Sequence, residues 1–473
     1  MLRSLAFWMT ILFSLSLFPA YTQDDPPPPL CSAEDLASSR LAGGVFAEVV
    51  SDASLTVYKD RSLGSDVVAR LGPGAQVYVL SDPRCSDDLI WWPLRFRREF
   101  ISGYAPEVVG GVGQLRPIFQ TLDVPTTDTP ITAANFGDLE PVAEAAYQEP
   151  VDLVWSPDGA RLAISTPWAV WVHDIKGVPS EPRRLDPTVR APWRMGALQF
   201  SRGGETLATV DVSDGDLHLW SLETDEHTVV DVEAEHYNGI AAISADLSMW
   251  ATASLGGSIS LWSAATGARL AVSEGHEAVG ALAFSPDGDR LVSAGYADPT
   301  GHGVRDTSLR LWDTTTGEQL AVFDLGAPFD QANDPGRAIT FSPDGTIAVF
   351  PLLVRGDRYQ AVMGILNVGE MSYTTWSVVD NLNSLSFSPN GDMLVVTLVG
   401  AAYSEAWSDP FALLLLNAAS GERLAELPVE RLVMRAAFSP EGTLLATTHA
   451  GLTSSGSVRT DLISSGVVVW AVP

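Results

Sequence analysis

The stretch that decides the fold reads Phe-Ser-Pro-Asp-Gly at residues 284–288. Closely related phrases recur at 155–159, 341–345, 387–391 and 438–442, and two degraded copies stand at 200–204 and 243–247. The serines of these seven copies are spaced 45, 43, 41, 57, 46 and 51 residues apart. A period in this range marks one supersecondary unit that is repeated and stacks on its neighbours to bury its apolar faces.

The clearest copy contains four short segments of strand character, at residues 281–284, 290–294, 308–313 and 319–323. Each is a short apolar run or alternates apolar with small or polar residues, as a sheet covered on both faces requires. Seven four-stranded units close into a ring that leaves only short edges exposed. The sequence therefore predicts an all-β protein with a seven-bladed β-propeller over residues 137–473.

The third strand of this copy ends in Trp312-Asp313, and Trp220, Trp262 and Trp470 stand at matching positions. Together with Gly275-His276, these residues resemble the WD-repeat family. The resemblance implies a buried hydrogen-bonded chain of His276, Ser293, Asp306 and Trp312. It also implies that a segment near residues 139–145 completes the last blade. A catalytic Ser-His-Asp interpretation is weaker, since it needs a nucleophile beside an open site.

The N-terminus carries Arg3 and an apolar run that is too short to span a bilayer. We expect a signal peptide over residues 1–22 and secretion or retention at the cell envelope, with no membrane insertion after cleavage; an uncleaved anchor is the alternative. A Pro-rich spacer follows at 23–30. A secreted chain with only Cys31 and Cys85 most simply pairs them, although two free thiols remain an alternative.

Residues 31–120 read as short strands broken by Gly, Pro and Asp, which predicts a small β-barrel. The step at 70–74, the strand at 77–80, Trp91-Trp92 and Gly103-Tyr104 resemble the bacterial Src-homology-3-like module. That family implies binding of cell-wall peptides or protein partners and supports a Cys31–Cys85 bridge. The start of the module at 55–58 departs from the family pattern, so a pure spacer role is an alternative.

Trp91 and Trp92 are adjacent in a predicted strand and should point to opposite faces. We expect one of them in the core of the small barrel and the other at a groove with Tyr58 or Tyr104. A linker rich in Thr, Pro and Asp separates this barrel from the propeller, at residues 121–136.

The chain carries a formal net charge of −30. Such a charge repels phosphate backbones and anionic lipid surfaces, so we expect neither nucleic acid nor a membrane surface as a partner. No nucleophile elbow, zinc-protease motif or phosphate loop is present in the sequence. Asp211, Asp214 and Asp216 could hold Ca²⁺ weakly, but a solvated turn is the favoured interpretation. We predict no metal and no cofactor.

Long insertions are expected between second and third strands at 296–306, 355–360, 400–410 and 449–465, on one face of the ring. Elaborated loops on a rigid scaffold are where binding usually occurs, and aromatic residues are enriched at interfaces. The candidate partner-binding residues are Trp193, Tyr237, Tyr296, Tyr359, Tyr403 and Trp407. Packing of each aromatic residue within its own loop is the alternative.

These observations predict a secreted, non-enzymatic protein that binds a protein or peptide through its propeller, with the small barrel as a targeting or spacing module. A propeller hydrolase or lyase with a site at the channel mouth is the second hypothesis. It would need convergent acidic, His or Arg residues at the channel.

Overall fold

The computed structural model describes residues 46–50, 54–79, 84–86, 89–96, 101–106, 108–109, 112–113, 115–118, 121–147, 150–166, 169–185, 195–211, 214–232, 237–295, 306–325, 339–355, 359–377, 382–398, 411–453 and 465–473. The segment expected to be a signal peptide, the Pro-rich spacer, Cys31, Trp193, Tyr296, Tyr403 and Trp407 lie outside these residues. Only the backbone of Cys85 and Tyr359 is described.

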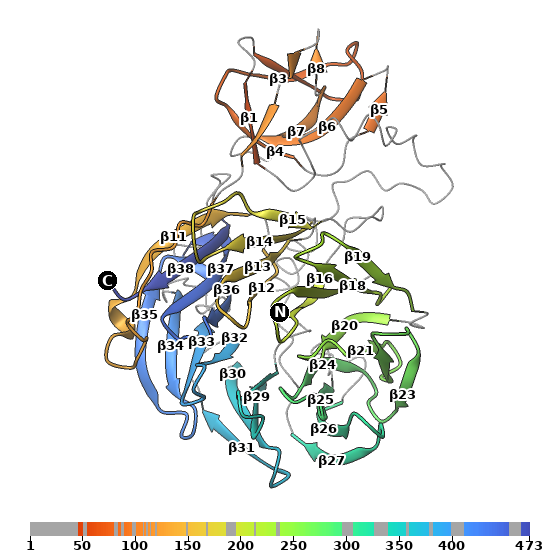
Figure 1. Ribbon diagram of the computed structural model, residues 1–473, viewed down its shortest axis with the longest axis vertical. Coiled ribbons are helices and arrows are strands. Elements are labelled where there is room, and N and C mark those ends of the chain that lie inside the picture. The colour runs from red at the N-terminus through yellow and green to blue at the C-terminus, as the bar shows by residue number, and fades with distance from the viewer. Residues whose placement is uncertain are drawn as a thin grey trace.

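The N-terminal part forms one curved antiparallel sheet, drawn at the top of Figure 1. Its strand order is β10 (Leu115–Ile118), β1 (Phe46–Val49), β4 (Gln76–Val79), β6 (Leu89–Phe96), β7 (Ile101–Pro106), β2 (Leu55–Tyr58) and β3 (Val67–Leu71), with β5 (Arg84–Ser86) paired to β6. A separate hairpin joins β8 (Val108–Val109) to β9 (Val112–Gly113).

Both tryptophans of β6 are buried. Trp92 belongs to the hydrophobic core, while Trp91 on the other face is 0% exposed and packs edge-on against Tyr58, with ring centroids 5.6 Å apart. The expectation that one of the two borders an open groove is therefore wrong. The aromatic surface that such a groove would present is covered.

The rest of the chain is a β-propeller in which four-stranded antiparallel sheets surround a common axis (Figure 1). The described residues form seven such sheets, which we call blades one to seven. Blades one to three consist of β12 (Asp152–Trp155), β13 (Arg161–Ser165), β14 (Val170–Asp174) and β15 (Arg183–Leu185); β16 (Met195–Phe200), β17 (Thr206–Asp211), β18 (Leu217–Ser221) and β19 (His227–Val230); and β20 (Tyr237–Ile243), β21 (Met249–Ser254), β22 (Ile259–Ser263) and β23 (Arg269–Ser273).

Blades four to six consist of β24 (Val279–Phe284), β25 (Arg290–Gly295), β26 (Ser308–Asp313) and β27 (Gln319–Asp324); β28 (Thr340–Phe341), β29 (Ile347–Arg355), β30 (Tyr359–Asn367) and β31 (Ser372–Ser377); and β32 (Leu382–Phe387), β33 (Met393–Leu398), β34 (Phe411–Asn417) and β35 (Arg423–Val429). Blade seven contains β36 (Arg431–Phe438), β37 (Leu444–Thr453), β38 (Gly466–Ala471) and β11 (Glu140–Ala146).

The two ends of the repeat region meet in blade seven. Strand β11 pairs antiparallel with β38, from Glu140 opposite Ala471 to Ala146 opposite Gly466. The prediction that an N-terminal segment completes the last blade is thus confirmed. Backbone hydrogen bonds between distant parts of the chain hold the ring together at this blade.

The segment that precedes β11 also contacts the propeller. Ile131 and Phe136, the latter in the 3-10 helix η1 (Phe136–Asp138), are buried in the apolar cluster of blades six and seven. The Ile131 N–H donates to the Gly442 carbonyl at 2.8 Å. The C-terminal part of the segment predicted as a linker is therefore attached to the ring.

The repeated Ser-Pro-Asp-Gly phrase forms a turn between the first two strands of a blade. In blade four, Ser285 Oγ lies 2.5 Å from Asp287 Oδ1 and accepts the Arg290 N–H at 3.0 Å. Asp287 Oδ1 accepts the Asp289 N–H at 3.0 Å, so the turn satisfies its own polar groups. Gly288 has φ 85°, a conformation that side chains disfavour.

The same phrase also contacts the next blade. A Cβ on Gly345 would lie 3.4 Å from Pro286 Cδ, and Gly391 and Pro343 of the following blades repeat this contact at 3.5 Å. The Gly of one turn therefore packs on the Pro of the turn before it. This double role explains why the phrase recurs in the sequence.

Parts of two of the expected insertions belong to strands. In blade five, β29 and β30 stay paired up to Arg355 opposite Tyr359, so Arg355, Tyr359 and Gln360 of the expected loop are strand residues. In blade seven, His449 lies within β37 opposite Gly466 and is 2% exposed. Both expectations began the loop within the strand, which ends at Arg355 in blade five and at Thr453 in blade seven.

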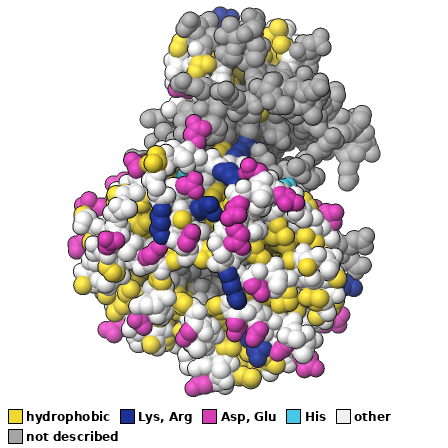
Figure 2. Space-filling model, viewed as in Figure 1, with side chains coloured by type: hydrophobic (Ala, Val, Ile, Leu, Met, Phe, Trp, Pro, Cys, Tyr) yellow, Lys and Arg dark blue, Asp and Glu magenta, His cyan; other side chains and the backbone are white. Residues whose placement is uncertain are grey.

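The acidic side chains are spread around the visible face of the ring and do not gather in one patch (Figure 2). Among the described residues no helix is long and apolar enough to cross a membrane.

Candidate functional site: a groove on blade three

A tryptophan on the third strand of a blade donates its indole N–H to a hydroxyl on the second strand. The distance is 2.8 Å for Trp262 to Thr252 in blade three and 2.8 Å for Trp312 to Ser293 in blade four. Blade seven repeats it, with Trp470 Nε1 2.8 Å from Thr447 Oγ1. The tryptophan and the hydroxyl are thus equivalent positions in the three blades, and the residues around them can be compared.

Blade four continues the pair into a longer buried chain. His276 Nε2 lies 2.7 Å from Ser293 Oγ, and His276 Nδ1 lies 2.7 Å from Asp306 Oδ2. Asp306 also accepts the N–H groups of Glu277 at 3.0 Å and of Ser308 at 2.9 Å. Burial alone would raise the pKa of Asp306, but the hydrogen bonds from His276 and Ser308 hold it well below its ordinary value.

The structure thus brings together His276, Ser293, Asp306 and Trp312, which the sequence singled out as a set. Ser293 is 0% exposed and both of its polar contacts are made within the chain of hydrogen bonds. All four side chains are buried, and within the described residues the Ser293 hydroxyl is enclosed by its hydrogen-bond partners, as is expected of a structural network.

Blade seven builds a shorter version from different positions. His449 Nε2 lies 2.7 Å from Thr447 Oγ1, and both residues belong to β37. Sequence reasoning missed this histidine as a network member because it looked for one ahead of the first strand, as in blade four. A histidine two residues after the hydroxyl, on the same strand face, is the signal that could have found it.

Blade three has the Trp–hydroxyl pair and lacks the rest of the blade-four chain. Counting back from the tryptophan, Gly256 stands where blade four has Asp306, and Ser260 stands where it has Arg310. The strand registers agree, because Ser260 lies opposite Thr252 and Arg310 lies opposite Ser293. The Asp306 and Arg310 side chains of blade four are therefore replaced in blade three by the much smaller side chains of Gly256 and Ser260.

In blade four the Arg310 side chain occupies the surface of the sheet. Its guanidinium hydrogen-bonds to Gln319 Oε1 and to the Gly275 carbonyl, and its Nε donates to Ser308 Oγ at 3.2 Å. The corresponding region of blade three is open and forms a groove of about 590 Å³. This volume is within the usual range of ligand pockets.

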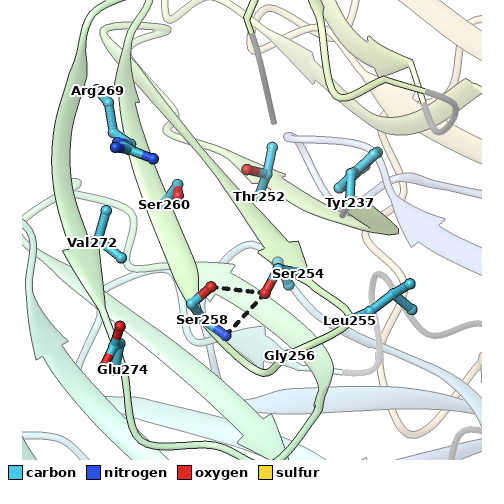
Figure 3. Close-up of a pocket in the computed structure, with 11 residues that line it drawn as sticks. Tyr237, Thr252, Ser254, Leu255, Gly256, Ser258, Ser260, Arg269, Val272 and Glu274 are labelled. Atoms are coloured by element: carbon cyan, nitrogen blue, oxygen red, sulfur yellow. Dashed lines mark hydrogen bonds between the residues drawn. The ribbon is translucent and has the colours of Figure 1, made fainter. Parts of the chain in front are cut away.

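Hydroxyl groups cover the floor of this groove, shown in Figure 3. Ser254 Oγ and Ser258 Oγ share a hydrogen bond of 2.7 Å. Arg269 and Glu274 stand at opposite ends, and Val272 lies between them on the same strand side (Figure 3). Leu255, 68% exposed, lies at the rim.

Tyr237 is the candidate partner-binding residue whose side chain the structure describes, and it lines this groove. Its Oη is shielded from solvent and has no hydrogen-bond partner among the described residues. Burial, and then the negative charges of Asp211 and Asp214, raise the pKa of Tyr237 above its ordinary value. The phenol therefore stays protonated and can donate a hydrogen bond.

The acidic hairpin of blade two is held by its own backbone. Asp214 accepts the Asp216 N–H at 3.1 Å, and Asp216 accepts the Val232 N–H at 2.8 Å. Burial, followed by the charges of Asp214 and Asp231, raises the pKa of Asp216 to about 6. Within the described part of the chain no three His, Cys, Asp or Glu side chains are grouped so that they could hold a metal ion.

Sequence reasoning found Tyr237 but missed Arg269, Glu274 and the hydroxyl floor. The groove could have been found from two residues that are missing. Blade three has the tryptophan, but it has neither an aspartate six residues before it nor an arginine two residues before it, as blade four does. The other aromatic candidates, Trp193, Tyr296, Tyr359, Tyr403 and Trp407, have no described side chains and cannot be assigned to this groove.

Comparisons with known proteins agree with this architecture. Residues 267–313 match the family WD domain, G-beta repeat. The match runs from the end of blade three through the third strand of blade four, and so includes the whole hydrogen-bonded chain. No curated protein sequence matches the chain.

Solved structures with a similar fold include hydrazine synthase from Kuenenia stuttgartiensis, with a TM-score of 0.50 and 13% sequence identity. The alignment covers 63% of this chain and 92% of the other. At this identity the likeness concerns the fold alone. The repeat match and this likeness together fit a WD-repeat β-propeller.

Proposed function

We propose that this protein is a secreted, non-enzymatic binding protein. Its seven-bladed WD-repeat propeller recognises a protein or peptide partner, and its Src-homology-3-like barrel targets or spaces it at the cell envelope. The match to the WD repeat, a family that generally mediates protein–protein interaction, supports the first part. The apolar N-terminal segment and the two cysteines of the sequence support secretion.

The observation that carries the proposal is the groove on blade three. It lies on a sheet whose core is packed on both sides, against blade two through Trp250 and against blade four through Ile259. A rigid framework keeps the backbone positions of Tyr237, Arg269 and Glu274 fixed relative to one another, which limits the entropy lost when a partner binds. The groove offers hydrogen-bonding and charged groups for recognition.

The test is a pull-down from an envelope fraction of the source organism with the mature chain, beginning at residue 23. A specific protein or peptide that is retained by the full chain, and competed by the free propeller, supports the proposal. Turnover of envelope material without a retained partner would contradict it and favour the hydrolase or lyase hypothesis.

The same assay tests the aromatic residues of the insertion expected at 400–410. Replacing Tyr403 and Trp407 with Ala should leave Tm within a few degrees, since surface-loop changes usually cost under about 0.5 kcal/mol. A true hot-spot aromatic residue should cost about 2 kcal/mol of binding or more. Unchanged retention would place the partner elsewhere, and a large fall in Tm would mean that these residues pack their own loop.

A further inference from the structure

We propose that the groove on blade three holds an extended peptide segment that carries a basic side chain and, four residues away, an acidic one. This inference rests on the proposed function and names the chemistry of one of its binding surfaces. The basic side chain would lie at Glu274 and the acidic one at Arg269.

The two charged residues are free to bind a ligand. Arg269 and Glu274 are both exposed, and among the described residues neither takes a hydrogen bond or an ion pair. The corresponding residues of blade four are Gln319 and Asp324. Gln319 accepts from Arg310, and Asp324 Oδ1 accepts the Thr307 hydroxyl at 2.9 Å. Blade three has thus lost the internal partners that blade four keeps.

The spacing of the two charges sets the length of the ligand. Arg269 begins β23 and Glu274 directly follows it, so they are five residues apart. At a rise of about 3.3 Å per residue this is roughly 16 Å, and the register shift, which adds one extra residue to the strand, reduces it to about four regular steps or roughly 13 Å. Because side chains alternate between the two faces of an extended chain, a peptide that pairs with both must carry its charges four residues apart.

The floor between the charges suits a peptide backbone. Ser260 takes no described hydrogen-bond partner. Ser254 Oγ accepts the Ser258 N–H at 3.2 Å and shares a hydrogen bond with Ser258 Oγ, which leaves acceptor capacity on Ser258 and one hydroxyl proton of the pair free to donate. Backbone N–H and C=O groups need such partners when they leave water. Leu255 and Val272, 68% and 46% exposed, provide apolar contact beside them.

The electric field decides which charge goes to which end. On one side of the Ser254–Ser258 pair, Tyr237 lies opposite Ser254 in the neighbouring strand. On the other side, Ile259 lies opposite Ser273, so the preceding residue Ser258 is level with Glu274. Asp211 and Asp214 act on Tyr237 at this end. These carboxylates add negative charge on the side of the groove that carries Glu274, and this end favours a Lys or Arg side chain. Arg269 offers a guanidinium at the other end, which suits a carboxylate.

The experiment uses four capped octapeptides of Ala and Ser, with Lys and Asp four positions apart so that both face the groove, with either charge alone, or with neither. Binding to the full chain is measured by isothermal titration at low salt, because exposed ion pairs are screened. The peptide with both charges should bind most tightly. Each charge should contribute about two- to fivefold in affinity, as exposed ion pairs do.

Single variants assign each charge to its end. Glu274→Gln should remove the advantage of Lys and leave that of Asp, whereas Arg269→Gln should do the reverse. Glu318→Gln, the same change at an exposed turn of blade four, should alter neither. Equal binding of the four peptides, no measurable binding, or an Asp advantage that depends on Glu274 would overturn the inference.

The two proposals can fail separately. If the groove variants retain the envelope partner as well as the wild-type chain, the protein is a binding protein with its site elsewhere, and the groove assignment is wrong. If the wild-type chain retains no partner but binds the doubly charged peptide with the expected variant pattern, the groove assignment stands without the envelope role.

Discussion

Blades three and four share a hydrogen bond from a tryptophan indole N–H to a hydroxyl, and they differ in the residues around this pair. In blade four, His276 hydrogen-bonds to Asp306 and Ser293, and Arg310 occupies the surface of the sheet, hydrogen-bonded to the Gly275 carbonyl. In blade three, Gly256 and Ser260 leave the same space open, with Arg269 and Glu274 at its ends. Both arrangements are compatible with the fold, because the core consists of apolar side chains packed between neighbouring blades and does not depend on the hydrogen-bonded chain.

The comparison predicts the largest loss of stability in blade four. Asp306→Ala would leave His276 Nδ1 and the N–H groups of Glu277 and Ser308 without their acceptor. Of these three groups only the His276 side chain is fully buried, whereas Glu277 is exposed and Ser308 half-buried. A buried polar group left unpaired costs about 1–3 kcal/mol, so with a smaller contribution from the two N–H groups we expect a total of roughly 2–4 kcal/mol. Urea unfolding of the full chain measures it.

The matched change in blade three is Glu274→Ala, which removes an exposed carboxylate. It should cost under about 0.5 kcal/mol of unfolding free energy. Similar losses for the two variants would mean that the blade-four chain contributes no more than a surface residue does.

A second pair of variants compares the two tryptophans. Trp312→Phe and Trp262→Phe lose the same volume and the same indole donor. Ser293 also pairs with His276, whereas Thr252 has no histidine partner, so the loss in blade four should spread along the chain. We expect Trp312→Phe to cost about 1 kcal/mol more than Trp262→Phe in urea unfolding. Equal costs would show that each indole bond acts alone.

Transplanting the blade-four arginine should close the groove. Ser260→Arg places a long side chain where Arg310 lies in blade four, and Glu274 is available to pair with it. Affinity for the doubly charged octapeptide should fall about tenfold, which corresponds to roughly 1.4 kcal/mol. Tm should change by no more than a few degrees. Unaltered peptide affinity with the folded variant would indicate that the peptide binds outside this groove.

The sequence alone predicts the repeat, the strand order of a blade and the closing strand, because each rests on local patterns such as the Ser-Pro-Asp-Gly turn. It also predicts the hydrogen-bonded set of blade four, through a family resemblance. It does not predict the groove, since Ser260 and Gly256 carry no motif. Their meaning appears only when Arg310 and Asp306 are seen to occupy the same positions in the next blade. Burial of Trp91 depended likewise on tertiary contacts.

The smallest predicted effect is on the pH dependence of stability, and it compares the carboxyl groups of Asp306 in blade four and Asp216 in blade two. Asp306 has a lowered pKa, so its contribution is complete above the unfolded value of about 3.9 and is lost as the pH falls through its folded pKa. Asp216 has its pKa raised to about 6 by burial and by Asp214 and Asp231. Its stabilisation is complete below about pH 4 and is lost as the pH rises through about 6.

Asp216→Asn keeps an acceptor for the Val232 N–H and removes the charge that blade two tolerates poorly at neutral pH. We therefore expect Tm to rise slightly at pH 7 and to match the wild type at pH 4. His218, the nearby base, does not reverse this sign at pH 7, because burial and then His227 lower its pKa to about 4 and it gains charge only at the acid end of this range. A variant that is less stable at pH 7 would mean that the Asp216 carboxylate accepts a hydrogen bond that the amide cannot replace.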